Sequence, residues 1–175
     1  MHYYFVNTTS LVFKRFRMQK PLTINEIEKK LEAYCAYQER CHAEVVSKMR
    51  NLGLPSGEID QVVVHLISGN FLNEERFAKA FARGKHRIKG WGISRIVNEL
   101  KARNISQYNI TAALKEIDAD DYETAFHNLA EKHWDGLNEK NTLKKRKKFC
   151  DFMLRKGYDP DQVYAKVRML EKNNG

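Results

Sequence analysis

The chain has 175 residues and a mass of 20.5 kDa, and its 31 Lys and Arg against 22 Asp and Glu give a formal net charge of +9. Hydrophobic residues make up 42% of it, with only 9 Gly and 3 Pro, which excludes disordered, collagen-like and low-complexity chains. The basic excess indicates an anionic partner: nucleic acid, an acidic protein surface or a lipid surface.

The three cysteines favour a reducing compartment. Cys35, Cys41 and Cys150 are an odd number, which argues against a disulfide framework. No stretch approaches the roughly 20 apolar residues of a membrane-spanning helix, and the apolar run at residues 3–6 is too short for a signal peptide. We therefore expect a cytoplasmic protein with no membrane segment.

The first 22 residues form an extension that differs from the rest of the chain. Residues 3–13 are rich in β-branched and aromatic side chains, which predicts either a short hairpin or a loose tail. The first helix begins after it, because Thr23 and Glu26 have the spacing of a capping box. Met18 lies just upstream of this helix and is a candidate for the natural start.

From residue 23 onward the apolar pattern is helical and it repeats. Gly53, Asn104 and Gly157 each end a helix, since Gly and Asn tolerate the left-handed conformation that closes helices. An apolar residue follows each of them, and the next helix starts in the same register every time. Because 51 residues separate the first two positions and 53 the last two, we interpret the chain as three tandem copies of one unit.

Each unit has room for three helices. The predicted fold is therefore all-α, with three three-helix repeats stacked into an elongated, curved array. The predicted domains are an extension at 1–22 and repeats at 23–70, 71–118 and 119–175. The predicted helices cover residues 23–39, 41–52, 56–68, 73–87, 92–103, 107–117, 121–136, 139–156 and 160–173.

The start of the second unit has a distinctive motif, followed by a basic, glycine-containing stretch and a helix with Glu99-Leu100. The motif reads Phe71-Leu72-Asn73-Glu74-Glu75-Arg76-Phe77-Ala78. It resembles the RecX family of bacterial recombination regulators over about residues 23–173. Asn104 stands where that family usually has Gly, and Asn73 where Asp is common. Both changes are mild, because Asn caps helices and accepts left-handed geometry.

The resemblance implies a function that the helix pattern alone does not. It implies a non-enzymatic modulator that binds the RecA recombinase along the groove of the RecA–DNA filament and inhibits strand exchange and ATP hydrolysis. It also implies binding of single- and double-stranded DNA. We expect a monomer without cofactor or metal.

The candidate RecA- and DNA-binding face lies mainly in the second unit. Eight basic residues between positions 79 and 103 oppose a single acid, Glu99, and clusters of this kind bind polyanions. A solvated surface is the alternative for such a run, and the eight-to-one imbalance favours a binding face. The residues are Lys79, Arg83, Lys85, Arg87, Lys89, Arg95, Lys101 and Arg103, with Trp91 among them.

Two aromatic positions and one arginine near this face have structural interpretations. Trp91, between two glycines, either stacks on a base or fills the core of its unit, and packing in the core is favoured. Phe77 is expected in the core, and Arg76 is expected to pair with an acid.

A second basic run covers residues 144–148 in the third unit. Five consecutive charges surround a helix, so only two or three can face one ligand. A contact surface and a solubilising surface are equally compatible with this run. Its candidate contact residues are Lys144, Lys145 and Lys148.

Patterns of catalytic and metal-binding chemistry are absent from the sequence. There is no phosphate-binding loop, nucleophile elbow or zinc-protease helix. Cys35, Cys41 and His42 are the only metal-like group, and they lack the paired Cys-x-x-Cys of a tetrahedral site. We therefore expect no enzyme activity.

Two other functions remain open on this reading. Residues 92–117 have the outline of a helix-turn-helix, and residues 106–109 would then reach base edges as in a sequence-specific transcription factor. A helical-repeat adaptor without any nucleic-acid role is the third possibility, and it predicts no salt-dependent DNA binding.

Overall fold

The computed structural model describes residues 22–173. The predicted hairpin or tail and Met18 lie outside these residues. Within 22–173 the chain folds into α-helices and one short 3-10 helix, without a strand. The helices are α1 (Ile24–Tyr37), α2 (His42–Asn51), η1 (Ser56–Glu58), α3 (Ile59–Ser68), α4 (Glu74–Lys89), α5 (Ile93–Lys101), α6 (Gln107–Leu114), α7 (Ala119–Asp135), α8 (Thr142–Lys156) and α9 (Pro160–Asn173).

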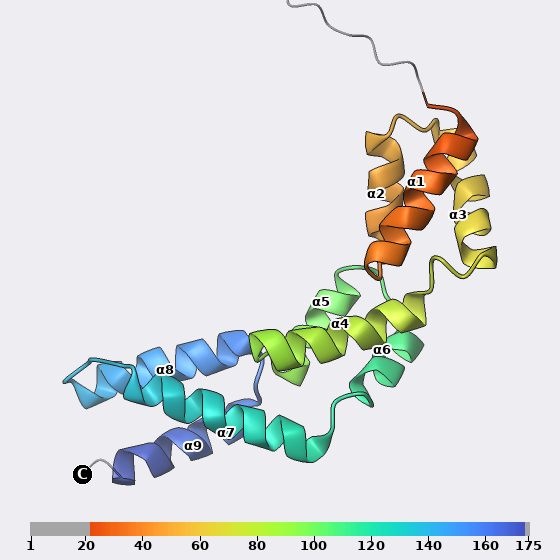
Figure 1. Ribbon diagram of the computed structural model, residues 1–175. Coiled ribbons are helices and arrows are strands. Elements are labelled where there is room, and N and C mark those ends of the chain that lie inside the picture. The colour runs from red at the N-terminus through yellow and green to blue at the C-terminus, as the bar shows by residue number, and fades with distance from the viewer. Residues whose placement is uncertain (1–21, 174–175) are drawn as a thin grey trace, which may run out of the picture.

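The helices gather in three groups that follow one another along a bent body (Figure 1). The first group is α1–α3, the second α4–α6 and the third α7–α9, and each has its own cluster of buried apolar side chains. Leu31 and Leu66 are fully buried in the first cluster, Leu100 in the second and Phe149 in the third. The predicted all-α, elongated and curved array is confirmed, and no described helix is long and apolar enough to cross a membrane.

The helix ends explain why the repeat is visible in the sequence. Gly53, Asn104 and Gly157 have φ angles of 83°, 59° and 90°, so all three adopt the predicted left-handed conformation. They follow α2, α5 and α8, the middle helix of each group. The predicted capping box is also present, since the Thr23 side chain accepts from the Glu26 N–H and Glu26 accepts from the Thr23 N–H.

Some helix ends differ from the prediction by a few residues. The predicted helix 107–117 ends at Leu114, because residues 115–117 form the turn that lets Asp118 cap α7 with its side chain. The predicted helix 139–156 begins at Thr142, because the Asn141 side chain accepts from the Lys144 N–H and caps α8.

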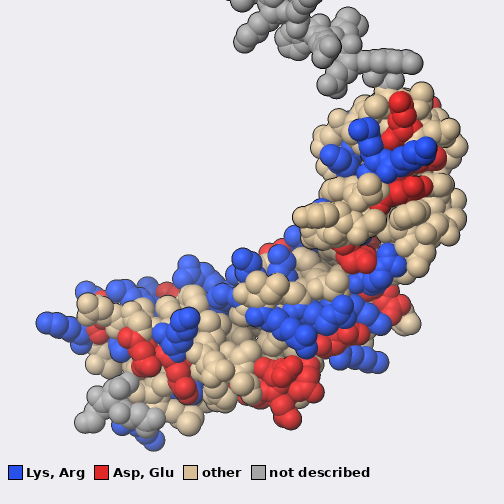
Figure 2. All heavy atoms as spheres, viewed as in Figure 1, with Lys and Arg blue, Asp and Glu red and all other residues tan. Residues whose placement is uncertain are grey.

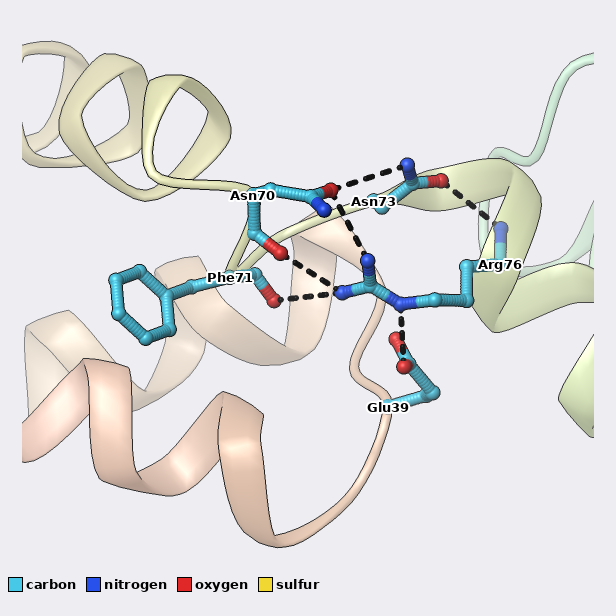
Figure 3. A network of polar contacts seen from close by, with 5 residues as sticks. All are labelled: Glu39, Asn70, Phe71, Asn73 and Arg76. Atoms are coloured by element: carbon cyan, nitrogen blue, oxygen red, sulfur yellow. Dashed lines mark hydrogen bonds and ion pairs between the residues drawn. The ribbon is translucent and has the colours of Figure 1, made fainter.

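The first joint connects the first and second groups through Arg76 (Figure 3). Its guanidinium donates to Glu39 Oε1 at 2.5 Å, to Asn70 Oδ1 at 3.0 Å and to Asn70 O at 3.0 Å. It also donates to Phe71 O at 3.4 Å. One side chain on α4 thus binds both the α1–α2 loop and the α3–α4 turn, and the expected pairing of Arg76 with an acid is confirmed. Phe77 is 5% exposed in the second core, as predicted.

The second joint connects the second and third groups through their backbones. The Gly92 N–H donates to Lys156 O at 2.8 Å, and the Ser94 N–H donates to Gly157 O at 3.1 Å. The N–H groups at the start of α5 are therefore satisfied by carbonyls at the end of α8. A side chain at Gly92 would overlap Gly157, since a Cβ there lies 2.6 Å from Tyr158 N. The two helix ends approach this closely because both positions are glycine.

Candidate nucleic-acid interface

The basic side chains of α4 divide between two sides of the helix. Positions 79, 83 and 87 follow one another at four-residue steps, whereas positions 85 and 89 lie roughly half a turn away from them. Figure 2 shows basic side chains over α4 with acidic side chains directly beside them at the start of α7. A run that looked uniform in sequence therefore forms two different surfaces.

We call the first surface the paired basic face, and it consists of Lys79, Arg83 and Arg87. Each of these three side chains has a carboxylate partner. Arg83 Nη1 lies 2.7 Å from Glu116 Oε2, Lys79 Nζ lies 2.7 Å from Glu75 Oε1, and Arg87 Nη2 lies 3.8 Å from Asp121 Oδ2. Its positive charge is largely neutralised within the chain.

We call the second surface the joint cluster, and it consists of Lys85, Lys89, Arg95 and Lys156. These side chains surround the second joint, and none of them lies within ion-pair distance of a carboxylate in the described part of the chain. Backbone carbonyls and aromatic rings contact them instead. Lys156 Nζ donates to Lys89 O at 2.6 Å, and Arg95 Nη1 donates to Arg155 O at 3.0 Å.

Trp91 contacts two cations of the joint cluster, Lys85 and Arg95. It is half-buried against the second core, and its ring meets Phe81 edge-on with centroids 6.2 Å apart. The Arg95 guanidinium lies 4.1 Å from the Trp91 ring centroid, and Lys85 Nζ lies 5.1 Å from it. Packing against the core, the favoured interpretation, is therefore what the structure has, and the ring also holds two cations.

Lys156 lies close enough to Arg95 and Lys89 for their charges to act on it. The pKa of Lys156 lies below its ordinary value, first because burial removes water from the ammonium group and then because Arg95 and Lys89 repel it. Lys156 was not among the residues that the sequence indicated. The sequence did contain one signal for it, since Lys156 directly precedes the helix-ending Gly157, but only the fold brings it beside α4 and α5.

The other predicted site residues lie away from the joint cluster or are engaged elsewhere. Arg103 Nη1 donates to Glu99 Oε2 at 2.7 Å, and its guanidinium lies 5.0 Å from the Phe81 ring centroid. Lys101, near the end of α5, is exposed and has no carboxylate within ion-pair distance among residues 22–173. Whether these residues contact a ligand stays a prediction.

The second basic run lies at the opposite end of α8 from the joint cluster. Lys144 is twelve residues from Lys156, which is about 18 Å along a helix. Lys148 Nζ lies 2.9 Å from Glu139 Oε2, Lys145 Nζ lies 4.4 Å from the Trp134 ring centroid, and Lys144 is exposed. The structure does not bring this run together with the basic side chains of the second group.

The helix that a helix-turn-helix would use for recognition is α6. Ser106 caps this helix by accepting from the Asn109 N–H, and Asn109 Nδ2 donates to Glu74. Gln107 donates to Thr111, so Tyr108, which is 75% exposed, is the one side chain of residues 106–109 without such an engagement in the described structure. Three of the four side chains at this helix start are thus engaged within the chain, which leaves few groups to contact bases.

The cysteines are buried and pack in the hydrophobic cores. Cys35 lies in the first core and Cys41 in the second, and burial raises the pKa of both thiols. Residues 22–173 contain no group of three or more side chains that could hold a metal ion.

Comparisons with known proteins agree with this geometry. Residues 73–114 match the family model for the second three-helix domain of RecX, and residues 120–167 match that for the third. The chain is 31% identical over 120 residues to the regulatory protein RecX of Vibrio campbellii, covering 69% of this chain and 76% of that protein. It is 29% identical over 128 residues to the regulatory protein RecX of Haemophilus influenzae, covering 73% and 83%.

The fold of a solved structure is also similar. The crystal structure of RecX from Lactobacillus salivarius superposes with a TM-score of 0.68 at 22% identity, covering 84% of this chain and 96% of that one. The middle and last groups of helices thus match the domains of one family in the same order along the chain. The chain belongs to the RecX family of regulatory proteins.

Proposed function

We propose that this chain binds the RecA recombinase filament and its DNA, and that it inhibits strand exchange and ATP hydrolysis by RecA. The observation that carries the proposal is the joint cluster, a group of cations without a carboxylate within ion-pair distance in the described chain. It lies in the middle of the array, where the second and third groups meet (Figure 1). Membership of the RecX family supplies the partner.

The electrostatic part of the proposal follows from the difference between the two surfaces. A cation that already faces a carboxylate gains little from a phosphate, because the phosphate must displace that carboxylate. No carboxylate of the described chain lies within ion-pair distance of the joint cluster, so a phosphate that binds there displaces no ion pair and still releases its counterions. DNA is therefore expected at the joint cluster rather than at the paired basic face.

A protein partner would find apolar surface next to the same cations. A groove of about 350 Å³ runs between α4 and the start of α2. Phe77, Phe81 and Gly84 form its apolar part, and Glu39 and Glu44 line its other side. Ile88 is 79% exposed at its edge, beside Lys85. An exposed aliphatic side chain at the edge of a basic surface is suited to a protein contact. This arrangement supports joint recognition of DNA and protein.

The proposal is tested by measuring DNA-dependent ATP hydrolysis by RecA at low salt, with the chain added in amounts equal to RecA. We expect hydrolysis and strand exchange to be inhibited. A Q107A/Y108A variant, changed only on α6, should inhibit as well as the unchanged chain. If the unchanged chain left ATP hydrolysis unaffected, the proposed function would be wrong. Loss of inhibition in the α6 variant alone would instead favour the helix-turn-helix interpretation.

A further inference from the structure

We infer that the joint cluster is a two-sided seat for the phosphate groups of one nucleic-acid strand. The second group of helices contributes Lys85, Lys89 and Arg95, and the third contributes Lys156, the last residue of α8. The inference rests on the proposed DNA binding and adds to it the ligand group, the residues and the requirement for two repeats. Lys156 makes it a site that no single repeat contains.

The way in which these cations are held suits a phosphate. Lys156 is fixed by the carbonyl of Lys89 and Arg95 by the carbonyl of Arg155, and neither contact neutralises a full charge. Each contact uses one donor, whereas an ammonium has three and a guanidinium five. The side chains are thus positioned in advance and keep donors for a ligand, which lowers the entropy that binding costs.

The Trp91 ring also holds the Arg95 side chain in position without neutralising its charge. Arg95 lies over the ring at 4.1 Å from its centroid, so that face of the ring is covered by the guanidinium. A cation–π contact holds a guanidinium in place and leaves its positive charge available to a phosphate. Trp91 is therefore a positioning residue for Arg95.

Helix dipoles do not account for the cluster. Cations are common at helix C-termini, and both α4 and α8 end here, at Lys89 and Lys156. Each of these two C-termini carries a partial charge of about −0.5, and the N-terminus of α5 carries about +0.5, so the helix dipoles together contribute about −0.5. Four full positive charges therefore exceed the local dipole charge by about 3.5 units. Such an excess is expected to attract a polyanion.

The mutual repulsion of these side chains supports the same inference. Arg95 and Lys89 lower the pKa of Lys156 beyond the effect of burial, so these three side chains repel one another when no ligand is bound. A phosphate between these side chains would relieve that repulsion and return the pKa of Lys156 toward its ordinary value. Because the charges come from α4, α5 and α8, they follow the surface across two groups of helices. A strand with successive phosphates fits this arrangement better than a single small anion.

The test compares the binding of a labelled oligothymidylate strand by three forms of the full chain over a range of KCl concentrations. The K89Q/K156Q variant removes two charges from the joint cluster. The K29Q/K30Q variant removes two exposed charges from α1 and controls for net charge. We expect K89Q/K156Q to bind at least about tenfold more weakly at low salt, and its slope of log Kd against log salt to fall by about 1.4, since each of the two lost phosphate contacts contributes about 0.7. The control should change less than about twofold.

Equal weakening in both variants would overturn the inference. Circular dichroism checks that each variant is folded. Should K89Q/K156Q unfold, K89Q and K156Q are measured separately, and each is expected to bind the strand more weakly than the control. The exposed Lys89 side chain has no hydrogen bond or ion pair within the described chain, so K89Q leaves the fold unchanged.

The RecA assay separates this inference from the proposed function. If the unchanged chain inhibits RecA while K89Q/K156Q binds the strand as well as the control, only the phosphate seat is wrong. If K89Q/K156Q loses strand binding as expected while the unchanged chain leaves RecA unaffected, only the proposed function is wrong.

Discussion

Replacing Gly92 with alanine is expected to lower the free energy of unfolding by about 2–4 kcal/mol. Gly92 has a φ of −77°, which any residue adopts, so the expected loss comes from overlap rather than from backbone strain. The added Cβ would lie 2.6 Å from Tyr158 N and closer still to Gly157. Because both sides of this contact are backbone, neither can move away as a flexible side chain would. The second joint must open, and its two hydrogen bonds to α8 must lengthen.

The measurement is urea unfolding followed by circular dichroism, and α4 offers a matched control. A Cβ at Gly84 meets no atom within 4 Å, and that position lies inside a helix. Gly84→Ala should therefore leave stability unchanged or raise it by about 0.5–1 kcal/mol. Equal stability of G92A and the unchanged chain would show that the second joint is not closed in solution. The phosphate seat would then lose its geometric basis.

Replacing Arg76 with alanine is expected to lower the free energy of unfolding by about 2–3 kcal/mol. The change removes the cation that faces Glu39 and leaves Asn70 O and Phe71 O without their donor (Figure 3). The Arg76 side chain is 39% exposed and that of Glu39 27%, so solvent screening reduces the ionic part of this loss. The multiple hydrogen bonds from one planar group account for the remainder.

Arg83→Ala is the matched control for Arg76→Ala, measured by the same urea unfolding. Arg83 is exposed to a similar extent, 42%, but it donates to a single carboxylate, Glu116. Its removal should cost about 0–1 kcal/mol. Arg76→Lys keeps the charge and loses the fork geometry, so an intermediate loss is expected. If R76A and R83A were equally stable, the first joint would not depend on the Arg76 network.

The fold was predictable because the residues that end its helices are determined by local backbone conformation. A left-handed residue at the end of a helix is usually Gly and sometimes Asn, so Gly53, Asn104 and Gly157 mark the repeat without knowledge of packing. The exact first and last residues of the helices were harder to predict. The start of α8 depends on which of several polar residues caps it, and Asn141 competes with its neighbours at residues 138–140 for that role.

The candidate site was predictable in its location and not in its composition. The basic run pointed to the second group, but the acids that neutralise Arg83 and Arg87 come from Glu116 and Asp121, more than thirty residues further along the chain. Conversely, Lys156 joins the cluster only through the backbone contact between Gly92 and Gly157. Counting charges along the sequence cannot reveal these contacts, because they form only when the groups of helices stack.

Side-chain footprinting by hydroxyl radicals reports which surface of the chain is covered by a RecA filament on single-stranded DNA, and it therefore tests binding at the joint cluster. We expect binding to the filament to protect Trp91 and Phe81, which lie at and beside the joint cluster, from oxidation. Tyr108 on α6 and Tyr37 at the end of α1, which are 75% and 87% exposed, should be oxidised as fast as in the free chain. Protection of Tyr108 with Trp91 and Phe81 unchanged would contradict the account, since it would place the interface on α6 and away from the joint cluster.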